Sequence, residues 1–129
     1  DVLNAAVSGT GLEFCITEIL FHDLEDPTVS YPDAPTVGFV TGTMNVYCTP
    51  QITDGPFPLC GFASYPNGTK FVVANGCMGP GTTTFSHEAG HFFWLPHTFS
   101  GTADGSNPEC VDGSNCGTAG DFLCDTAEY

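Results

Sequence analysis

Three of the chain's four histidines fall within eleven residues, HEAGHFFWLPH, at positions 87–97. A helix turns by about 100° per residue, and an apolar set then gathers on one flank: Phe85, Ala89, Phe92 and Phe93. His87 and His91 share the other flank, which predicts a helix with one side to bury and a histidine side to present. Pro96 disfavours helical geometry at Leu95, so we expect the helix to end before this pair.

The spacing of the histidines suits a metal ion. Four residues separate His87 from His91, which stacks their imidazoles one turn apart, where both can bind one zinc ion at about 2.0–2.1 Å. If the helix continued, His97 would lie about 9 Å further along the axis and face away. The chain must therefore turn back for His97 to become the third ligand. Three protein ligands leave a fourth position for water, as a hydrolytic zinc site requires.

Glu88 lies next to His87 and is poorly placed as a ligand. It is well placed to polarise a water on the zinc as general base, the role of the glutamate in H-E-x-x-H. The pattern H-E-x-x-H alone also occurs by chance in helices that bind no metal. The third histidine, the helix break and the position of the glutamate together favour a metal site. The fourth histidine, His22, is isolated in a loop-like region and is interpreted as a surface residue.

The charge of the chain argues against two classes of partner. Fifteen acidic residues stand against a single basic one, Lys70, and give a net charge of −14. Nucleic acid and anionic membrane surfaces would repel such a protein. No apolar run approaches the roughly 20 residues needed to span a bilayer, so we expect no membrane insertion. With 129 residues, 41% hydrophobic and 12% charged, the chain is expected to fold as a single unit.

Seven cysteines are dense for this length, and none forms the C-x-x-C pair of a zinc ribbon. They favour disulfides and an oxidising, extracellular compartment. Cys48 and Cys60 flank a Pro-rich loop that they could staple, and the odd count leaves at least one cysteine free or paired elsewhere. Asn67 begins an N-glycosylation acceptor pattern that is equally well explained as an ordinary turn. The chain begins at Asp1 without a signal segment, as expected of a processed or excerpted piece.

The local pattern predicts both helices and strands. Residues 1–10 are expected to be the end of a helix that runs into a Gly-rich turn. Strands are expected at four places: residues 11–16, 43–48, 61–65 and 70–74. The Pro-rich stretches 22–37 and 49–59 are expected to be loops. Thr82 or Thr83 can cap the helix that carries the histidines, and the Gly- and Asp-rich region after His97 shows little periodicity.

The spacing H-E-x-x-H-x-x-x-x-x-H is that of the metzincin zinc endopeptidases, and the chain resembles one branch of them, the pappalysin family. The matches are short and keep the same order: VLN at 2–4, GLEF at 11–14, MNVY at 44–47, GFASYP at 61–66, residues 83–91, HTFSG at 97–101, residues 110–116 and GDFLCDT at 120–126. The resemblance implies that the zinc ligands are His87, His91 and His97 and that Glu88 is the general base. It also implies that the strand near 61–65 is the sheet edge along which a peptide substrate lies, extended and antiparallel.

By the same resemblance, the acidic loop after His97 corresponds to the region where family members bind calcium. The candidate ligands are Asp112, Asp121 and Asp125, although turns explain these residues equally well. The implied fold is α+β, a metzincin-like upper subdomain with a twisted, mostly parallel sheet, an antiparallel edge strand and packed helices that include the zinc-binding one. The family's lower subdomain, with its Met-turn, has no counterpart here, so residues 1–129 are interpreted as the N-terminal part of a catalytic domain.

Trp94 departs from the family pattern, which usually has glycine at the turn before the third histidine. A bulky residue is strained at positive φ. Two outcomes are open: either Trp94 takes another backbone path, or His97 is displaced from the site.

These patterns predict a secreted zinc metalloendopeptidase, a hydrolase that cleaves peptide bonds with a zinc-bound water activated by Glu88. The expected partner is a peptide or protein substrate, and the protein would be a glycoprotein if Asn67 is modified. The competing hypothesis is a non-catalytic extracellular module, structural or adhesive, that has kept the metzincin fold. A third hypothesis is a zinc-dependent hydrolase that is not a protease.

Overall fold

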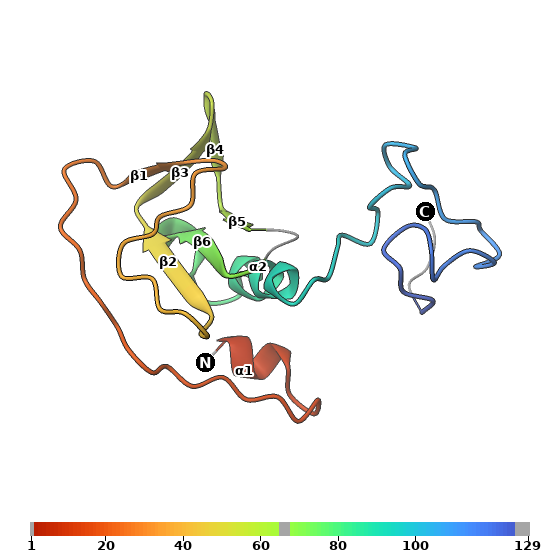
Figure 1. The fold of residues 1–129 in the computed structure, drawn as a ribbon, viewed down its shortest axis with the longest axis horizontal. Coiled ribbons are helices and arrows are strands. Elements are labelled where there is room, and N and C mark those ends of the chain that lie inside the picture. The colour runs from red at the N-terminus through yellow and green to blue at the C-terminus, as the bar shows by residue number, and fades with distance from the viewer. Residues whose placement is uncertain (1, 65–67, 126–129) are drawn as a thin grey trace. The chain divides into compact units, whose positions relative to one another are not determined.

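The computed structural model describes residues 2–64 and 68–125. By its internal contacts the chain divides into two compact units, Asp1–Trp94 and Leu95–Tyr129. The helices and strands found in the described residues all belong to the first unit (Figure 1). No described helix combines the length and the hydropathy that a membrane span requires.

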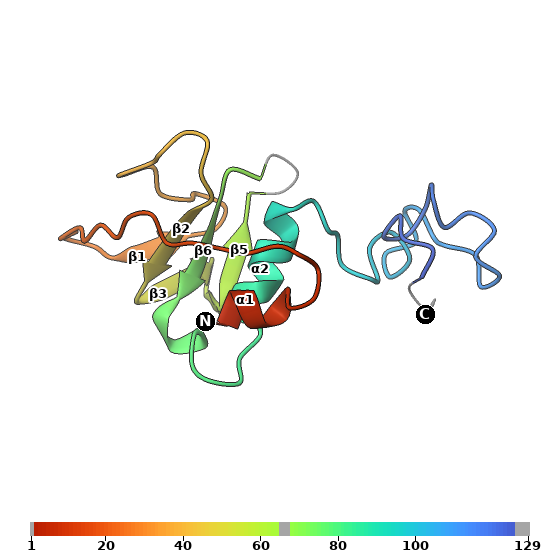
Figure 2. The same cartoon turned by 90° about the horizontal axis from the view of Figure 1, so that it is seen from below.

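A three-stranded sheet forms the centre of the first unit (Figure 2). Its strands, in spatial order, are β2 (Asn45–Thr49), β6 (Lys70–Ala74) and β5 (Gly61–Ala63). β2 runs parallel to β6, and β5 runs antiparallel to it at the edge. The predictions of strands near 43–48, 61–65 and 70–74 and of an antiparallel edge strand are thus confirmed. Residues 65–67, which include Asn67 and the end of the second of these predicted strands, lie outside the described residues.

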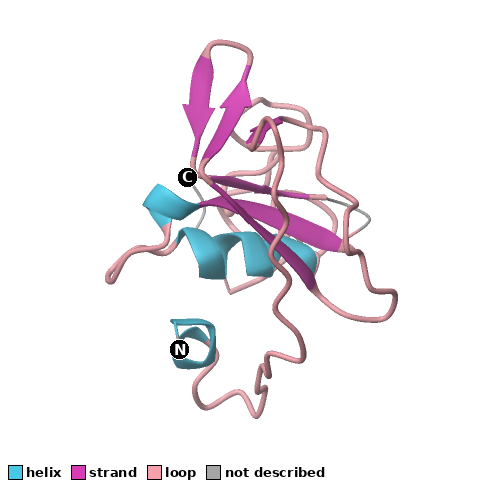
Figure 3. Cartoon of the chain, turned by 90° about the vertical axis from the view of Figure 1, so that its left-hand side faces the viewer, coloured by secondary structure: helices cyan, strands magenta, loops and turns pink. Residues whose placement is uncertain are grey.

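A second sheet lies where the sequence predicts loops. Its three strands, in spatial order, are β1 (Thr28–Ser30), β3 (Gln51–Asp54) and β4 (Phe57–Leu59). β1 pairs with β3 in parallel, and β3 forms an antiparallel hairpin with β4 (Figure 3). Gly55 takes a φ of 56° in the tight turn of this hairpin, and Pro58 is tolerated because β4 is an edge strand. The prediction that 49–59 is a loop is therefore wrong, and the described residues form two small mixed sheets in place of one mostly parallel sheet.

Both faces of the central sheet are covered by other elements. Alternate residues of β6 point to opposite sides of the sheet, so each side contributes apolar side chains to a buried cluster. One side faces the helices α1 (Val2–Ala6) and α2 (Thr84–Phe92), with a buried cluster of Leu3, Phe71, Val73 and Ala89. The other side faces the second sheet, with a buried cluster of Val29, Ile52, Phe62, Val72 and Ala74. The two helices beside the sheet are visible in Figure 2. The α+β class is confirmed, and α2 lies directly against β5 and β6.

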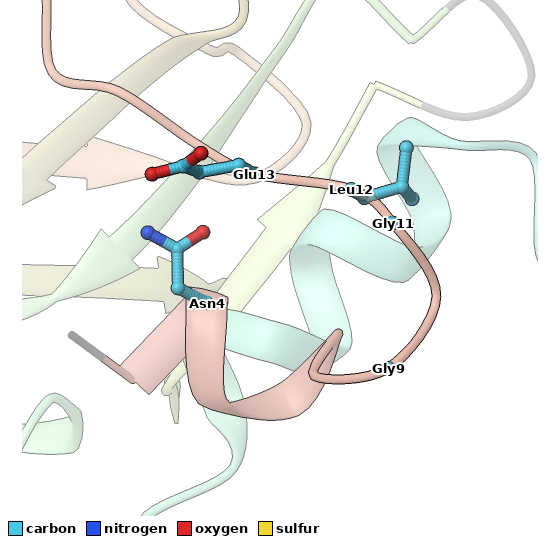
Figure 4. Close-up of a pocket in the computed structure, with 5 residues that line it drawn as sticks. All are labelled: Asn4, Gly9, Gly11, Leu12 and Glu13. Carbon is cyan, nitrogen blue, oxygen red and sulfur yellow. The ribbon is translucent and has the colours of Figure 1, made fainter.

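The predicted strand at 11–16 is wrong, and residues 11–27 form no helix or strand. The main chain of Phe14 is satisfied by a side chain instead. Its N–H donates to Asn4 Oδ1 at 2.7 Å, and its carbonyl accepts from Asn4 Nδ2 at 2.9 Å. The Asn4 amide thus takes the place of a neighbouring strand. A hollow beside this contact, lined by none of the histidines, is formed by Asn4, Gly9, Gly11, Leu12 and Glu13 (Figure 4).

Two disulfides are present in the described residues: Cys60–Cys77 and Cys116–Cys124. The first joins the residue before β5 to the short 3-10 helix η1 (Asn75–Cys77) that follows β6, so it closes the end of the β5–β6 pair. The staple suggested between Cys48 and Cys60 is therefore wrong. Three cysteines keep free, exposed thiols: Cys15, Cys48 and Cys110.

The second unit is built of turns over its described residues, 95–125. Asparagine side chains hold these turns together. Asn115 Oδ1 accepts from Cys110 N at 2.6 Å, and Asn115 Nδ2 donates to Pro108 O at 3.1 Å. Asn107 Nδ2 donates to Thr118 O at 3.0 Å. This network explains how a stretch with little periodicity is ordered without regular elements.

Candidate metal centre

Helix α2 carries the histidine motif and occupies Thr84–Phe92, as the periodicity predicts. Thr83 is its N-cap residue, but the Thr83 side chain makes no capping bond. The Thr83 carbonyl accepts instead from His87 N at 2.8 Å and from Ser86 Oγ at 2.9 Å. The predicted N-cap position is confirmed, whereas the predicted side-chain cap is not formed.

His87 and His91 lie together on the exposed flank of α2. Their Nε2 atoms are 3.2 Å apart, and their rings meet nearly edge to face with centroids 4.7 Å apart. Burial, and then the charge of the nearby His91, lower the pKa of His87 below its ordinary value of 6.5. Since a neutral imidazole is the form that binds a metal, this environment favours the ligand state of His87 at neutral pH.

Glu88 turns away from the solvent, with only 6% of its side chain exposed. Its Cγ and Oε1 lie beside Gly61 of the edge strand β5. Burial raises the pKa of Glu88 from 4.5 to about 7, because a charged carboxylate loses its hydration there. Such a value is suited to a group that accepts and returns a proton near neutral pH.

Lys70, the single basic residue of the chain, is engaged elsewhere. Its ammonium group donates to the carbonyl oxygens of Ala34 at 3.0 Å and Pro35 at 2.7 Å. Both are main-chain acceptors in the loop after β1. The one lysine therefore serves to anchor that loop.

Trp94 takes a φ of 68°, in the left-handed region, just after the end of α2. Its N–H donates to His91 O at 3.0 Å, and Phe93 N donates to Ala89 O at 3.2 Å and to Gly90 O at 2.9 Å. This is the geometry that usually places glycine after a helix. The first expected outcome is therefore wrong, because Trp94 follows the backbone path of a glycine. The candidate ligand atom of His97 lies within 4.8 Å of those of the other two histidines.

The three histidines form a group that could hold a metal ion. One ring nitrogen from each of His87, His91 and His97 lies within 4.8 Å of the others. Two nitrogens on one tetrahedral zinc ion are separated by about 3.3 Å when each bond is about 2.05 Å, so the 3.2 Å between His87 and His91 fits. Among the described residues this is the only such group of three or more His, Cys, Asp or Glu side chains. The donor set could hold a metal ion and is consistent with zinc.

The aspartates proposed for calcium are not part of any such group in the described residues. Asp112 Oδ1 accepts from Ser114 N at 3.0 Å, and this bonding to Ser114 lowers the pKa of Asp112. Asp121 is 1% exposed; its Oδ1 accepts from Leu123 N at 2.9 Å, while its Oδ2 has no hydrogen-bond partner. Asp125 is exposed. Asp112 thus forms the turn contact that is the alternative to calcium binding, and the calcium site stays a prediction.

Comparison with known proteins gives distant relatives of one kind. Over 83 residues the chain is 30% identical to an extracellular metalloprotease of Arthroderma benhamiae and to one of Trichophyton verrucosum, a match that covers 54% of this chain and 29% of either relative. A further extracellular metalloprotease of Arthroderma benhamiae is 27% identical over 155 aligned positions, which cover 98% of this chain and 45% of the relative. The chain is similar to extracellular metalloproteases.

These matches have clear bounds. The chain spans less than half the length of the relatives it matches. No protein-family model matches it, and no solved structure matches it. The relatives agree with the histidine motif in pointing to a metalloprotease, and they do not distinguish the pappalysin branch from other metalloproteases.

Gly61 lies near the site and contacts Glu88. The sequence does not reveal this contact. This glycine belongs to a strand that the pattern identifies, and the small residues Gly61 and Ala63 alternate along it on the side that faces α2. That alternation is the available signal, because small residues let a helix approach a strand closely. The partner of Gly61 comes only from the tertiary structure.

Proposed function

We propose that this chain belongs to the catalytic part of a secreted zinc endopeptidase of the pappalysin type. The observation that carries the proposal is a buried glutamate, Glu88, on the same helix as a histidine pair whose separation of 3.2 Å suits one zinc ion. The similarity to extracellular metalloproteases supports it. So do the disulfides, which are typical of an oxidising compartment.

The metal would be held by His87, His91 and His97, and a bound zinc ion would supply Lewis-acid polarisation of the peptide carbonyl and lower the pKa of water at the site. Glu88 would accept a proton from the attacking water and return it to the leaving amine. A carboxyl group with a pKa of about 7 can do both near neutral pH. The burial of Glu88 against β5 keeps bulk water from competing for the same carboxylate.

The edge of the central sheet offers a place for the substrate. Ala74 N donates to Cys60 O at 2.8 Å, and Ser64 N donates to Lys70 O at 3.1 Å, so residues 60 and 64 bond to β6. Hydrogen-bonding direction alternates along an antiparallel pair, and the main-chain groups of Gly61 and Ala63 therefore face the free edge. An extended peptide can add to this edge as a further antiparallel strand.

The calcium ligands, the upper-subdomain fold and the glycan at Asn67 belong to the same proposal. They rest on the resemblance to the pappalysin family and on the sequence. Asp121 Oδ2, buried without a hydrogen-bond partner, supports a cation in the second unit.

Peptide cleavage by the whole protein tests this function. We expect activity that is lost with a zinc chelator, restored by zinc and abolished by Glu88→Ala, while zinc content stays at one ion per chain. Glu18→Ala, which removes an exposed carboxylate outside the motif, serves as the control and should leave cleavage unchanged. Cleavage that survives both chelation and Glu88→Ala would refute the proposal. Zinc binding without any cleavage would favour the non-catalytic module.

A further inference from the structure

Gly61 lies where the edge strand β5 meets the buried side chain of Glu88 on helix α2. A Cβ atom at this position would lie 2.9 Å from both Cγ and Oε1 of Glu88, and 3.0 Å from the carbonyl oxygen of Val72. Real Cβ atoms essentially never approach other atoms more closely than 3.0 Å. The Glu88 side chain therefore occupies the space that any other residue at 61 would need.

The backbone does not explain this glycine. Gly61 is not among the residues with positive φ in the described chain, so an L-residue could adopt its conformation. Within a strand, glycine is less favourable than alanine, because it loses more conformational freedom on folding. Space for Glu88, rather than flexibility, is the reason for glycine here.

We propose that Gly61 is a positioning residue for Glu88. Its missing side chain allows the carboxylate to rest directly against β5, the strand whose outward main-chain groups would pair with a peptide. The proton acceptor and the peptide-binding edge are thereby held at contact distance. This inference rests on the proposed function, since it assigns Gly61 a role in the same reaction.

Gly61→Ala in the whole protein is the direct test. The added methyl group has to displace Glu88, because the end of a flexible side chain yields more readily than the Val72 main chain. We expect kcat to fall on the order of 100-fold, as for a misplaced catalytic group, while KM changes less than about threefold. Zinc content should be unchanged, because the three atoms nearest to the added Cβ belong to Glu88 and Val72 and not to a histidine.

Gly76→Ala is the matched control. Gly76 is exposed, has no positive φ, and has no atom within 4 Å of the position that a Cβ would take. The same substitution there should leave kcat, KM and zinc content unchanged. A loss of kcat at residue 61 only would then separate the contact with Glu88 from the general effect of replacing a glycine.

A second measurement does not depend on activity. In the zinc-free protein, Gly61→Ala should lower the Tm by several degrees, and it should lower the Tm far less, or raise it, in the Glu88→Ala background, where Cγ and Oε1 are gone. If Gly61→Ala alone fails to fold, recovery of folding by the double variant supports the proposal equally.

Two results would overturn the inference. One is a Gly61→Ala enzyme with unchanged kcat, in a protein whose cleavage Glu88→Ala abolishes. The other is an equal loss of Tm, or of folding, with and without Glu88, which would assign the clash to the Val72 main chain. Retention of cleavage by Glu88→Ala would instead refute the proposed function, whereas the stability coupling between residues 61 and 88 would remain measurable.

Discussion

Replacing Trp94 tests the turn that follows the metal-binding helix. The residue has a φ of 68° and its side chain is 57% exposed. An L-residue in the left-handed region costs about 1–2 kcal/mol. Glycine avoids this cost but loses about 0.5–1 kcal/mol more conformational entropy than alanine on folding. Trp94→Gly should therefore be more stable than Trp94→Ala by about 1 kcal/mol, or about fivefold in the unfolding equilibrium.

The comparison of these two variants isolates the backbone. Both remove the indole ring and its contacts, so the loss of those contacts cancels in the difference. The free energy of unfolding should be measured in denaturant by circular dichroism, because Trp94 is the only tryptophan and its fluorescence disappears in both variants. The zinc-free protein is the cleaner sample, since a bound metal would itself stabilise the turn.

The opposite ranking would refute the reasoning. If Trp94→Ala equals or exceeds Trp94→Gly in stability, residue 94 does not have a left-handed backbone in solution. The order Ala above Gly is the ordinary one inside helices and strands, so the expected inversion is a distinctive result.

Three further predictions follow from the first unit. In the zinc-free protein, Glu88 holds its proton more tightly when folded, so its stabilising contribution is present below pH 4.5 and is lost as the pH rises through about 7. Unfolding of Glu88→Gln, measured from pH 4 to 8, should lack this decline. Gly68→Ala should destabilise the fold by about 1–3 kcal/mol, because its Cβ would lie 2.5 Å from the main-chain oxygen of Phe92, as a thermal melt would show. Replacing Cys60 and Cys77 together by serine opens a loop with a sequence separation of 17 and should cost about 3 kcal/mol in chemical denaturation.

Each of these predictions has a clear contrary result. A pH dependence that is identical in Glu88→Gln and wild type would show that another group causes it. Gly68→Ala with the stability of Gly76→Ala would mean that the end of α2 does not contact residue 68. The variant without Cys60 and Cys77 could instead be as stable as the wild type when both proteins are measured without a reducing agent. That result would show that β5 and η1 are held together without the covalent link.

Periodic segments are the part of the fold that the sequence predicts well. Helix α2 follows from apolar residues at helical spacing, and β6 follows from the run Phe71, Val72 and Val73, which is buried on both faces. In each case local preference and burial favour the same structure. The candidate ligands His87 and His91 follow for the same reason, because they share one flank of that helix.

The sequence predicts a loop where the β3–β4 hairpin lies, because prolines surround this segment. Pro50, Pro56 and Pro58 predict a loop, yet Pro58 lies in an edge strand, where its missing N–H removes no bond that the sheet needs. The strand predicted at 11–16 is absent for a different reason. Its alternating pattern is compatible with a strand, but pairing with Asn4 leaves its main chain without a strand partner.

The position of Trp94 and the contact of Gly61 with Glu88 could not be predicted from local pattern. Tryptophan at positive φ contradicts its own preference, and the surrounding turn overrides it. Gly61 and Glu88 are far apart in sequence and meet only because α2 packs against β5. Both features depend on tertiary structure, which composition and spacing do not encode.

The placement of Lys70 has a consequence for resistance to proteolysis. Enzymes of the trypsin type cut after lysine or arginine, and this chain offers them a single peptide bond, between Lys70 and Phe71. That bond is the first of the central strand β6. Phe71 is fully buried there, and strands pair with β6 on both sides. Cleavage would require the middle of the sheet to unfold first. The composition that makes the chain acidic thus leaves a whole class of digestive enzymes without an accessible site for as long as the protein stays folded.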